Sequence, residues 1–283
     1  MIKAAVIGDP ISHSLSPKLH RYFLNKYDIE GQYSAINVKP ENLERDVVEL
    51  LENQGFAGFN ATIPHKENLF KLCVHKGFDL TESALATETV NTIYRQNDQI
   101  WGSNSDSYGF SKNLLNAIKK TNYKTALILG AGGAARCAIF SLLNDFNCEK
   151  IYIINRDHTR AQNLVNLYKN LSEKLILIEK IDKNIGNELD LLVNTTPLGM
   201  KNQEELKIDL TNLNKNAIIY DIVYNPLMTK LLENAKSRGN PIITGLGMLI
   251  FQALEGFEKW FKIKPELNKN DFNELVKILT KNI

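Results

Sequence analysis

The segment from Thr125 to Arg160 constrains the fold most strongly. An apolar run beginning at Thr125 leads into a glycine loop, a helical pattern and a second apolar run. The pattern G-x-G-x-x-A falls on Gly130, Gly132 and Ala135. In such a unit, the first glycine permits a tight turn, the second admits a pyrophosphate, and the small third residue keeps the helix close to the sheet. A purely structural glycine turn would not require all three, so the segment predicts a dinucleotide-binding strand–helix–strand unit.

The loop and the helix that follows predict where a phosphate binds. The free N–H groups and the dipole of a helix N-terminus favour an anion. The residues expected to contact the cofactor here are Gly130, Ala131, Gly132, Gly133 and Ala134.

The end of the second strand bears on which dinucleotide binds. Sites that prefer NAD usually place an acid about 20 residues beyond the loop. This chain has Asn155 and Arg156 there, with Arg160 one helical turn on. Guanidinium groups suit a 2′-phosphate, which favours NADP, although a solvated surface role for Arg160 remains open. The carboxylate of Asp157 could instead repel that phosphate or bind a ribose.

The rest of the chain predicts two α/β domains with mainly parallel sheets, because apolar β-branched runs alternate with helical patterns. We expect a substrate domain over residues 1–105, completed by helices in 247–283, and a Rossmann-like domain over 106–246, with a cleft between them. The expected N-terminal strands are Lys3–Gly8, Tyr33–Val38, Phe56–Thr62 and a hairpin of Thr89–Tyr94 with Gln99–Trp101. The expected C-terminal strands are Thr125–Leu129, Lys150–Ile154, Leu175–Ile178, Leu189–Asn194, Ala217–Ile222 and Pro241–Thr244.

The expected helices follow the same alternation. They are Ser16–Tyr27 with Ser16 as its cap, Glu41–Asn53, one opening at Pro64, Asp106–Lys120, Met248–Phe261 and Pro265–Lys281. Met200–Asn216 is polar and weakly patterned, so we expect an irregular surface loop there.

Charge and composition exclude several function classes. The net charge of +2 and scattered lysines argue against nucleic-acid binding. No apolar window is long enough to cross a bilayer, and Met1–Pro10 lacks the apolar core of a signal peptide. Cys73, Cys137 and Cys148 have no metal-like spacing and fit free packing thiols in a reducing cytoplasm. A cytoplasmic protein without a metal is therefore expected.

Motifs with a distinctive order run through nearly the whole chain. They are Gly8-Asp-Pro-Ile-Ser-His-Ser-Leu-Ser-Pro17, Phe59-Asn-Ala-Thr-Ile-Pro-His-Lys66, Val90-Asn-Thr92, Gly102-Ser-Asn-Ser-Asp-Ser-Tyr-Gly-Phe110, Gly130-Ala-Gly-Gly-Ala-Ala-Arg136 and Gly245-Leu-Gly-Met-Leu-Ile-Phe-Gln252. In their residues and their order, these motifs resemble those of shikimate dehydrogenases. The resemblance implies reversible reduction of 3-dehydroshikimate to shikimate with NADPH, in the pathway to chorismate and the aromatic amino acids.

The resemblance also implies roles for individual residues. It makes Lys66 the catalytic acid/base and Asp106 its partner, although the residues alone would suggest a surface lysine and an acid at a helix start. The residues that it assigns to substrate binding are Ser14, Ser16, Thr62, Lys66, Asn91, Asp106, Tyr224 and Gln252. It places Ile222 and Gly245 near the nicotinamide. A helix cap would explain Ser16 alone but not Ser14, and a half-buried tyrosine or an exposed glutamine would equally explain Tyr224 and Gln252.

The chain departs from the family pattern at a few positions. Ala61 replaces a valine, Glu88-Thr89 replaces small residues, Ser105 replaces a threonine, and Asp157 replaces the threonine after Asn155-Arg156. Only Asp157 bears on cofactor preference. A quinate/shikimate dehydrogenase that uses NAD, and a non-catalytic nucleotide sensor on the same fold, remain alternatives. We expect a small-molecule substrate and a monomer or homodimer.

Overall fold

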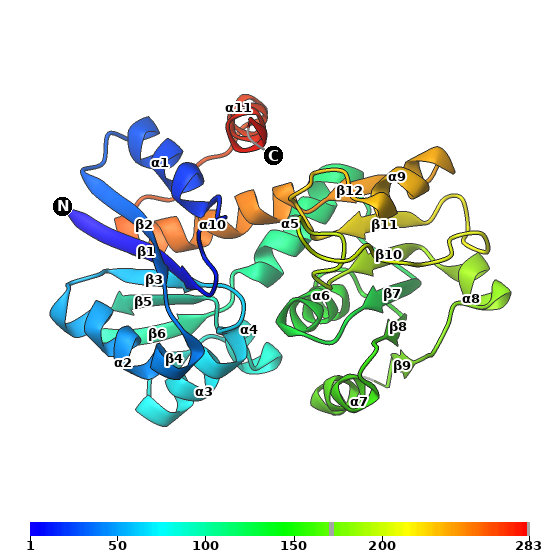
Figure 1. Cartoon of the computed structure of the whole chain (residues 1–283), viewed down its shortest axis with the longest axis horizontal. Coiled ribbons are helices and arrows are strands. Elements are labelled where there is room, and N and C mark those ends of the chain that lie inside the picture. The colour runs from blue at the N-terminus through cyan, green and yellow to red at the C-terminus, as the bar shows by residue number, and fades with distance from the viewer. Residues whose placement is uncertain (170–172, 282–283) are drawn as a thin grey trace. The chain divides into compact units, whose positions relative to one another are not determined.

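The computed structural model describes residues 1–169 and 173–281. The chain divides into two compact units, each built around its own sheet (Figure 1). Within the described residues, the first unit comprises Met1–Gly109 and 249–281, and the second comprises Phe110–Met248. Both units are α/β, so the expected fold class is confirmed.

The first unit contains a six-stranded sheet in the order β2-β1-β3-β5-β6-β4. Its strands are β1 Ile2–Gly8, β2 Gly31–Asn37, β3 Gly58–Ala61, β4 Asp79–Leu80, β5 Thr92–Gln96 and β6 Gln99–Ser103. β1 pairs in parallel with β2 and β3, whereas β5 is antiparallel to both β3 and β6. The expected hairpin at Asn97-Asp98 is confirmed, because both residues adopt the left-handed conformation that such a turn requires.

The helices of this unit differ from the expectation at two places. They are α1 Ser16–Lys26, α2 Leu43–Val48, α3 Lys66–Lys76, α4 Glu82–Thr87, α10 Leu246–Phe261 and α11 Lys269–Thr280, and α5 Asp106–Ile118 begins here. The segment expected as one helix over Glu41–Asn53 is helical throughout, but its type changes: a 3-10 turn Pro40–Asn42 precedes α2 and a π-helical turn Glu49–Asn53 follows it. The short β4 and α4 were not expected, since two and six residues are too few to show a period.

Aromatic side chains fill the space between α1, β2 and α10. The ring of His20 stacks on Tyr33 at a centroid distance of 3.8 Å, and Trp260 and Phe257 lie beside it. The indole of Trp260 donates to the carbonyl of Ile93 over a distance of 2.9 Å. A side chain at Gly58 would collide with that indole and with Ile93, so the glycine allows α10 to approach the sheet closely.

The second unit contains a fully parallel sheet in the order β12-β11-β10-β7-β8-β9. Its strands are β7 Thr125–Leu129, β8 Lys150–Ile154, β9 Leu175–Leu177, β10 Leu191–Asn194, β11 Ile218–Asp221 and β12 Ile242–Thr244. The helices are α6 Gly133–Asn144, α7 His158–Leu167, α8 Lys183–Glu188 and α9 Lys230–Ser237. All six strands were expected from the sequence, because both faces of a parallel sheet are covered and its strands are therefore continuously apolar.

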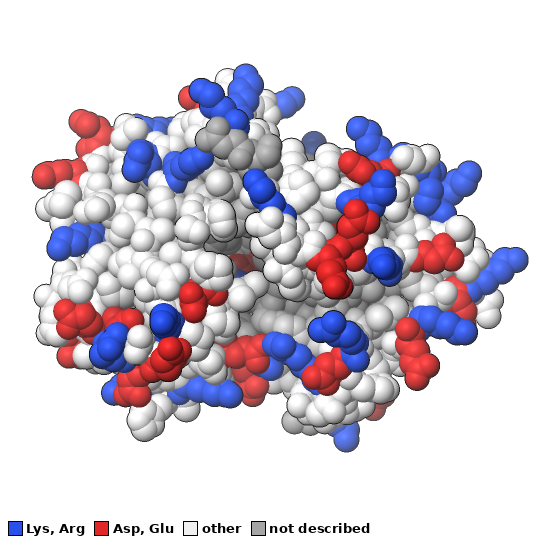
Figure 2. Space-filling model, in the orientation of Figure 1, with Lys and Arg blue, Asp and Glu red and all other residues white. Residues whose placement is uncertain are grey.

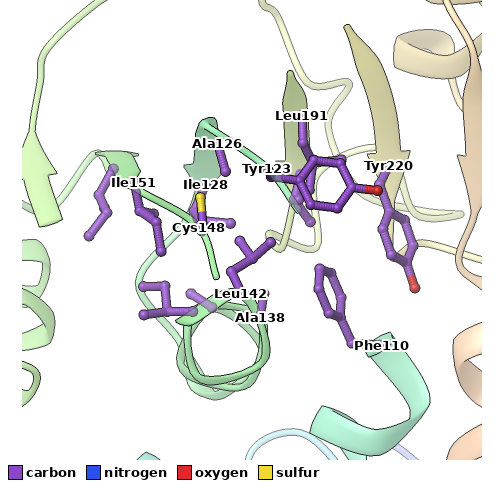
Figure 3. Close-up of a cluster of buried hydrophobic side chains, with 14 of the residues drawn as sticks. Phe110, Tyr123, Ala126, Ile128, Ala138, Leu142, Cys148, Ile151, Leu191 and Tyr220 are labelled. Carbon is purple, nitrogen blue, oxygen red and sulfur yellow. The ribbon is translucent and has the colours of Figure 1, made fainter. Parts of the chain in front are cut away.

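The core of the second unit explains why the Thr125–Arg160 segment folds as it does. Every residue of β7 is buried, and Ala126 and Ile128 pack against Ala138 and Leu142 of α6 (Figure 3). The segment Met200–Asn216 contains no helix or strand, as expected.

The surface and the buried thiols agree with an ordinary globular protein. Basic and acidic side chains are interspersed on the face shown in Figure 2. No helix within the described residues is both long and apolar enough to span a bilayer. All three cysteines are free and buried. Burial raises the pKa of Cys73 to about 12 and that of Cys148 to about 11.

Candidate active site

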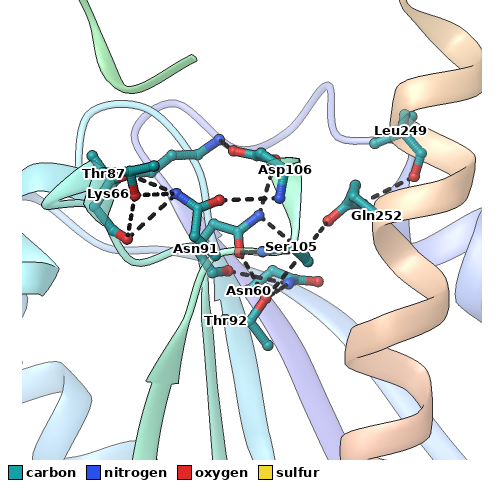
Figure 4. Close-up of polar contacts among 11 residues, drawn as sticks. Asn60, Lys66, Thr87, Asn91, Thr92, Ser105, Asp106, Leu249 and Gln252 are labelled. Atoms are coloured by element: carbon teal, nitrogen blue, oxygen red, sulfur yellow. Dashed lines mark hydrogen bonds and ion pairs between the residues drawn. The ribbon is translucent and has the colours of Figure 1, made fainter. Parts of the chain in front are cut away.

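The centre of the candidate site in the first unit is an ion pair between Lys66 and Asp106. Lys66 is the first residue of α3, and Asp106 is the first residue of α5. The Lys66 ammonium donates to Oδ2 of Asp106 (Figure 4). The carboxylate is buried with 8% of its side chain exposed, while 21% of the Lys66 side chain is exposed. A buried carboxylate needs such a partner, and the Lys66 side chain that provides it is only partly buried.

Asn91 holds the second oxygen of the carboxylate. Its Nδ2 donates to Oδ1 of Asp106 over a distance of 2.9 Å. Its Oδ1 accepts from the backbone N–H of Ser105 at 2.9 Å and from the hydroxyl of Thr92 at 2.8 Å. Because donors surround Oδ1, the amide can face Asp106 only with its nitrogen. Both carboxylate oxygens are therefore held in place.

Gln252 belongs to the same cluster through Ser105. The Ser105 hydroxyl donates to Oε1 of Gln252 over 3.2 Å, and Nε2 of Gln252 donates to the carbonyl of Leu249 within α10 (Figure 4). Gln252 is buried rather than exposed on its helix. Lys66, Asn91, Asp106 and Gln252, which lie far apart in the sequence, are thus brought together.

Ser14 and Ser16 lie just before and at the start of α1. The expected role of Ser16 as the helix cap is wrong, because Leu15 occupies that position and Ser16 is the first helical residue. Ser14 supports the helix start instead, since its hydroxyl accepts from the backbone N–H of Ser16 at 3.3 Å. With the capping role removed, the side chain of Ser16 is available for another role.

Thr62 follows β3 and is partly exposed. Its backbone N–H donates to the carbonyl of Ile7 at 2.9 Å, and its methyl group lies where a side chain at Gly8 would be. Thr62 thus lies beside the end of β1, from which the loop containing Ser14 departs.

The sequence analysis assigned no role to several buried residues that support this cluster. Asn104 accepts from the N–H of Asp106 at 3.0 Å, and its amide donates to Thr89 at 2.6 Å. Thr89 donates in turn to Thr87 at 2.9 Å. Thr89, one of the two residues that replace the small residues of the family pattern, therefore gives Asn104 a hydroxyl partner. Only a run of small polar residues in an apolar context hinted at these positions.

The glycine loop in the second unit has the geometry expected for a pyrophosphate. Gly130 has φ of 111°, and a side chain there would lie 2.8 Å from the hydroxyl oxygen of Thr195. Gly132 precedes α6, and no side chain caps this twelve-residue helix. Its first N–H groups are therefore free of a capping side chain, and an added Cβ at Gly132 would meet only the Arg160 guanidinium at 3.6 Å. Glycine and free N–H groups thus fit an anion at this helix N-terminus.

Arg160 and Asp157 flank that loop in different roles. The Arg160 guanidinium donates to the carbonyl of Ala131 at 3.2 Å. This side chain therefore contacts the glycine loop and does not simply extend into solvent. Asp157 caps α7, because its carboxylate accepts from the Arg160 N–H at 3.0 Å. Asn155 donates to the carbonyl of Asp157 at 2.7 Å, and Arg156 is exposed. Asp157 therefore has a structural role that the sequence did not indicate.

The ends of β11 and β12 place Ile222, Tyr224 and Gly245 in the second unit. An added side chain at Gly245 would lie 1.9 Å from the carbonyl oxygen of Ile222, so only glycine fits there. Tyr224 follows in the same loop and is partly buried. Nearby, the buried Asp221 accepts from Thr229 at 2.7 Å and from Asn194 at 2.9 Å. Burial raises the pKa of Asp221.

A metal centre is not evident at either location. Among residues 1–169 and 173–281, no group of three or more histidine, cysteine or acidic side chains could hold a metal ion. The groups gathered around Lys66 and Asp106 are an ammonium, a carboxylate, amides and hydroxyls.

Comparisons with known proteins identify the family. One family model, described as the shikimate dehydrogenase substrate binding domain, matches residues 6–93, and another, described as shikimate / quinate 5-dehydrogenase, matches residues 113–224. The chain is 39% identical over 272 residues to a shikimate dehydrogenase (NADP(+)) of Bartonella tribocorum, covering 94% of this chain and 91% of the relative. It is 41% identical to the enzyme of that name from Paramagnetospirillum magneticum, covering 94% of both chains.

A solved structure gives the same result. Shikimate 5-dehydrogenase from Thermus thermophilus, in complex with NADP(H) and shikimate, is similar with a TM-score of 0.83 and 30% identity, covering 99% of this chain and all of the other. The resemblance inferred from the motifs is confirmed, and the chain belongs to the shikimate dehydrogenase family.

Proposed function

We propose that this protein catalyses the NADP-dependent, reversible reduction of 3-dehydroshikimate to shikimate. The observation that carries this proposal is the ion pair between the buried carboxylate of Asp106, both of whose oxygens are hydrogen-bonded, and the partly exposed side chain of Lys66. A catalytic acid must be positioned within hydrogen-bond reach of the oxygen that it protonates. In a member of the shikimate dehydrogenase family, this pair can protonate the substrate oxygen while a carbonyl is reduced to a hydroxyl.

Lys66 donates the proton in the direction of reduction. Its ammonium passes a proton to the oxygen of the substrate as that oxygen gains charge, and it takes the proton back when shikimate is oxidised. Asp106 accepts a hydrogen bond from the same hydroxyl and keeps the Lys66 side chain in place. Asn91 keeps Asp106 from turning, so the acid and the substrate oxygen meet in one orientation.

The remaining substrate contacts select shikimate by its polar groups. Ser14 and Ser16 bind the carboxylate, near the first turn of α1. Thr62, Asn91 and Gln252 bind the ring hydroxyls, and Tyr224 is a further substrate contact. A ring without hydroxyl groups would leave these hydroxyl and amide groups of the site without hydrogen-bond partners, so it would bind less well than shikimate.

The second unit holds NADP. When bound, NADPH supplies the hydride that reduces the substrate carbonyl. Gly130, Ala131, Gly132, Gly133 and Ala134 receive the pyrophosphate. Asn155, Arg156 and Arg160 bind the ribose and its 2′-phosphate, with Asp157 holding the start of α7. Ile222 and Gly245 lie beside the nicotinamide.

An absorbance assay tests the proposal directly. The purified protein is mixed with shikimate and NADP, and the appearance of NADPH is followed at 340 nm. Rapid, shikimate-dependent reduction is expected. No reduction with shikimate, despite binding of NADP by calorimetry, would contradict the proposal and favour a nucleotide-sensing protein.

The same assay distinguishes the second candidate, a quinate/shikimate dehydrogenase that uses NAD. Asp157 is the residue that favours it, since a carboxylate near the ribose suits NAD. Initial rates are compared for shikimate and quinate, each with NADP and with NAD. A higher kcat/KM for NAD or for quinate would favour that candidate over the strict NADP enzyme. A cytoplasmic location and a monomeric or homodimeric state are part of the same proposal.

A further inference from the structure

Tyr33 is a buried tyrosine outside the proposed substrate contacts, yet its hydroxyl reaches the polar interior of the first unit. Tyr33 lies in β2, opposite Ala4 of β1, and Asn60 lies in β3, opposite Val6 of the same strand. The Tyr33 hydroxyl donates to Oδ1 of Asn60 over a distance of 2.8 Å. This hydrogen bond therefore connects the two strands that flank β1.

The amide of Asn60 has only one orientation that satisfies its neighbours. Its Nδ2 donates to the carbonyl of Asn91 at 3.1 Å and to the hydroxyl of Thr92 at 2.9 Å. Reversing the amide would bring its oxygen against the carbonyl of Asn91. A buried amide oxygen needs a donor, and the Tyr33 hydroxyl is that donor.

Thr92 passes this orientation on to Asp106. Its hydroxyl accepts from Asn60, and its own hydrogen is directed to Oδ1 of Asn91 at 2.8 Å. Nδ2 of Asn91 is thereby left for Oδ1 of Asp106 at 2.9 Å. A continuous hydrogen-bond path thus runs from Tyr33 through Asn60, Thr92 and Asn91 to the carboxylate that holds Lys66.

The tyrosine itself is held firmly. Its ring stacks on His20 with an interplanar angle of 15° and lies beside Trp260 at a centroid distance of 5.7 Å. Ser16 lies close enough to the phenol to oppose in part the effect of burial on its pKa. Burial raises the pKa of Tyr33 well above its usual value, so the phenol keeps its proton and remains a donor to Asn60.

We propose that Tyr33 is a positioning residue for the substrate site, whose hydroxyl begins the Asn60–Thr92–Asn91–Asp106 path. This inference rests on the proposed function of Asp106 and Lys66. Tyr33 acts through the residues of this path and does not touch the substrate. Its hydroxyl holds Asn60 in one orientation and thereby keeps the acid–base pair in place.

The test replaces the hydroxyl alone. Tyr33→Phe keeps the ring and its stacking on His20 but removes the donor to Asn60. The matched control is Tyr168→Phe, because the hydroxyl of the buried Tyr168 also donates a hydrogen bond, to the carbonyl of Arg136 at 2.8 Å, in the second unit. We expect kcat/KM for shikimate to fall about tenfold in Tyr33→Phe. The KM for NADP should stay unchanged, and Tyr168→Phe should keep wild-type kinetics at a similar loss of Tm.

A second measurement needs no activity. The side-chain amide resonances of Asn60 and Asn91, assigned by selective asparagine labelling, should shift in Tyr33→Phe and not in Tyr168→Phe. Unchanged resonances would overturn the positioning role even if the wild-type protein does not oxidise shikimate. Inactivity of the wild type would count only against the proposed function. Wild-type shikimate kinetics in Tyr33→Phe would also overturn the inference, as would equal kinetic losses in both variants.

A double-mutant cycle tests whether the path is continuous. Thr92→Val removes the next hydroxyl along it. If Tyr33 acts through Thr92, the double variant should lose little more kcat/KM than the more impaired single variant. Fully multiplicative losses would show that the two hydroxyls act independently and would overturn the path.

Discussion

The two units prepare their proposed sites in opposite ways. In the first unit, the site consists of side chains that orient one another: Asp106 is fixed by Asn91, and Asn91 by Thr92 and the backbone of Ser105. In the second unit, the site consists mainly of backbone, with glycines at Gly130 and Gly132 and exposed side chains such as Arg156. A substitution in the first unit should therefore alter the orientation of side chains that it does not contact directly. A substitution in the second unit should affect only the position that is replaced.

The largest expected effect tests the first half of this comparison. Lys66→Ala should lower kcat by about 10²–10⁴-fold, because the proton donor is removed while the polar contacts to substrate remain. Steady-state kinetics measure the loss, and calorimetry with NADP measures the cofactor affinity, which should not change. Turnover close to that of the wild type would show that Lys66 is not the acid/base.

The reverse experiment changes the backbone site. Gly130→Ala places a Cβ against Thr195 at a φ of 111°, a conformation that costs of the order of 1–3 kcal/mol for other residues. We expect the KM for NADP to rise about tenfold or more, with little change in the affinity for shikimate measured without cofactor. An equal loss of affinity for NADP and for shikimate would mean that the two sites depend on each other.

The aromatic cluster of the first unit predicts a pH dependence of stability. Burial lowers the pKa of His20 to about 3, and neither ring nitrogen has a hydrogen-bond partner within the part of the chain that the structure describes. The unfolded chain binds a proton near pH 6.5, whereas the folded chain does not until near pH 3. Stability is therefore lost as the pH falls through this window.

His20→Phe should remove that dependence while retaining the stacking. The free energy of unfolding is measured by urea denaturation for the variant and the wild type at pH 4.5 and at pH 7. Relative to the wild type, the variant should be about 2 kcal/mol more stable at pH 4.5 than it is at pH 7. Glu255 gives stability the opposite dependence on pH. Burial raises its pKa from 4.5 to about 7, so stability is lost as the pH rises between these two values. Comparing variant with wild type at each pH cancels this contribution. A difference that does not change with pH would contradict the prediction.

The smallest effect concerns Asp157, where the two roles of one side chain compete. Asp157→Ser keeps a residue that can cap α7 but removes the negative charge near the 2′-phosphate. We expect the ratio of kcat/KM for NADP over NAD to rise about threefold to tenfold, with the melting temperature nearly unchanged. A fall in that ratio would mean that the carboxylate assists NADP binding.

The sequence predicted the second unit better than the first, for a physical reason. A parallel sheet requires continuous apolar runs, and a phosphate loop requires glycine at fixed spacing, so both are evident in the order of residues. All six strands, the glycine loop and the irregular segment Met200–Asn216 were accordingly found. The capping role of Asp157 was missed, since it depends on where α7 starts.

The first unit was predicted less completely because its site depends on contacts between distant residues. Lys66 and Asp106 alone looked like a surface lysine and an ordinary helix start, and only the family resemblance joined them. Nothing local to Tyr33 or Thr92 indicates a partner, because their hydrogen bonds cross between strands. The start of α1 at Ser16 was predicted correctly, but its cap was wrongly assigned to Ser16, since serine before proline is the usual cap pattern.

The buried thiols offer a separate report on each unit. Cys73 lies in α3 of the first unit, and Cys137 and Cys148 lie in the second. Because an alkylating agent must reach the thiolate, buried thiols react only when the surrounding structure opens. The rate at which each cysteine is labelled therefore measures how often its own unit opens. The chain carries in its native sequence the probes needed to tell whether the two units open together or separately.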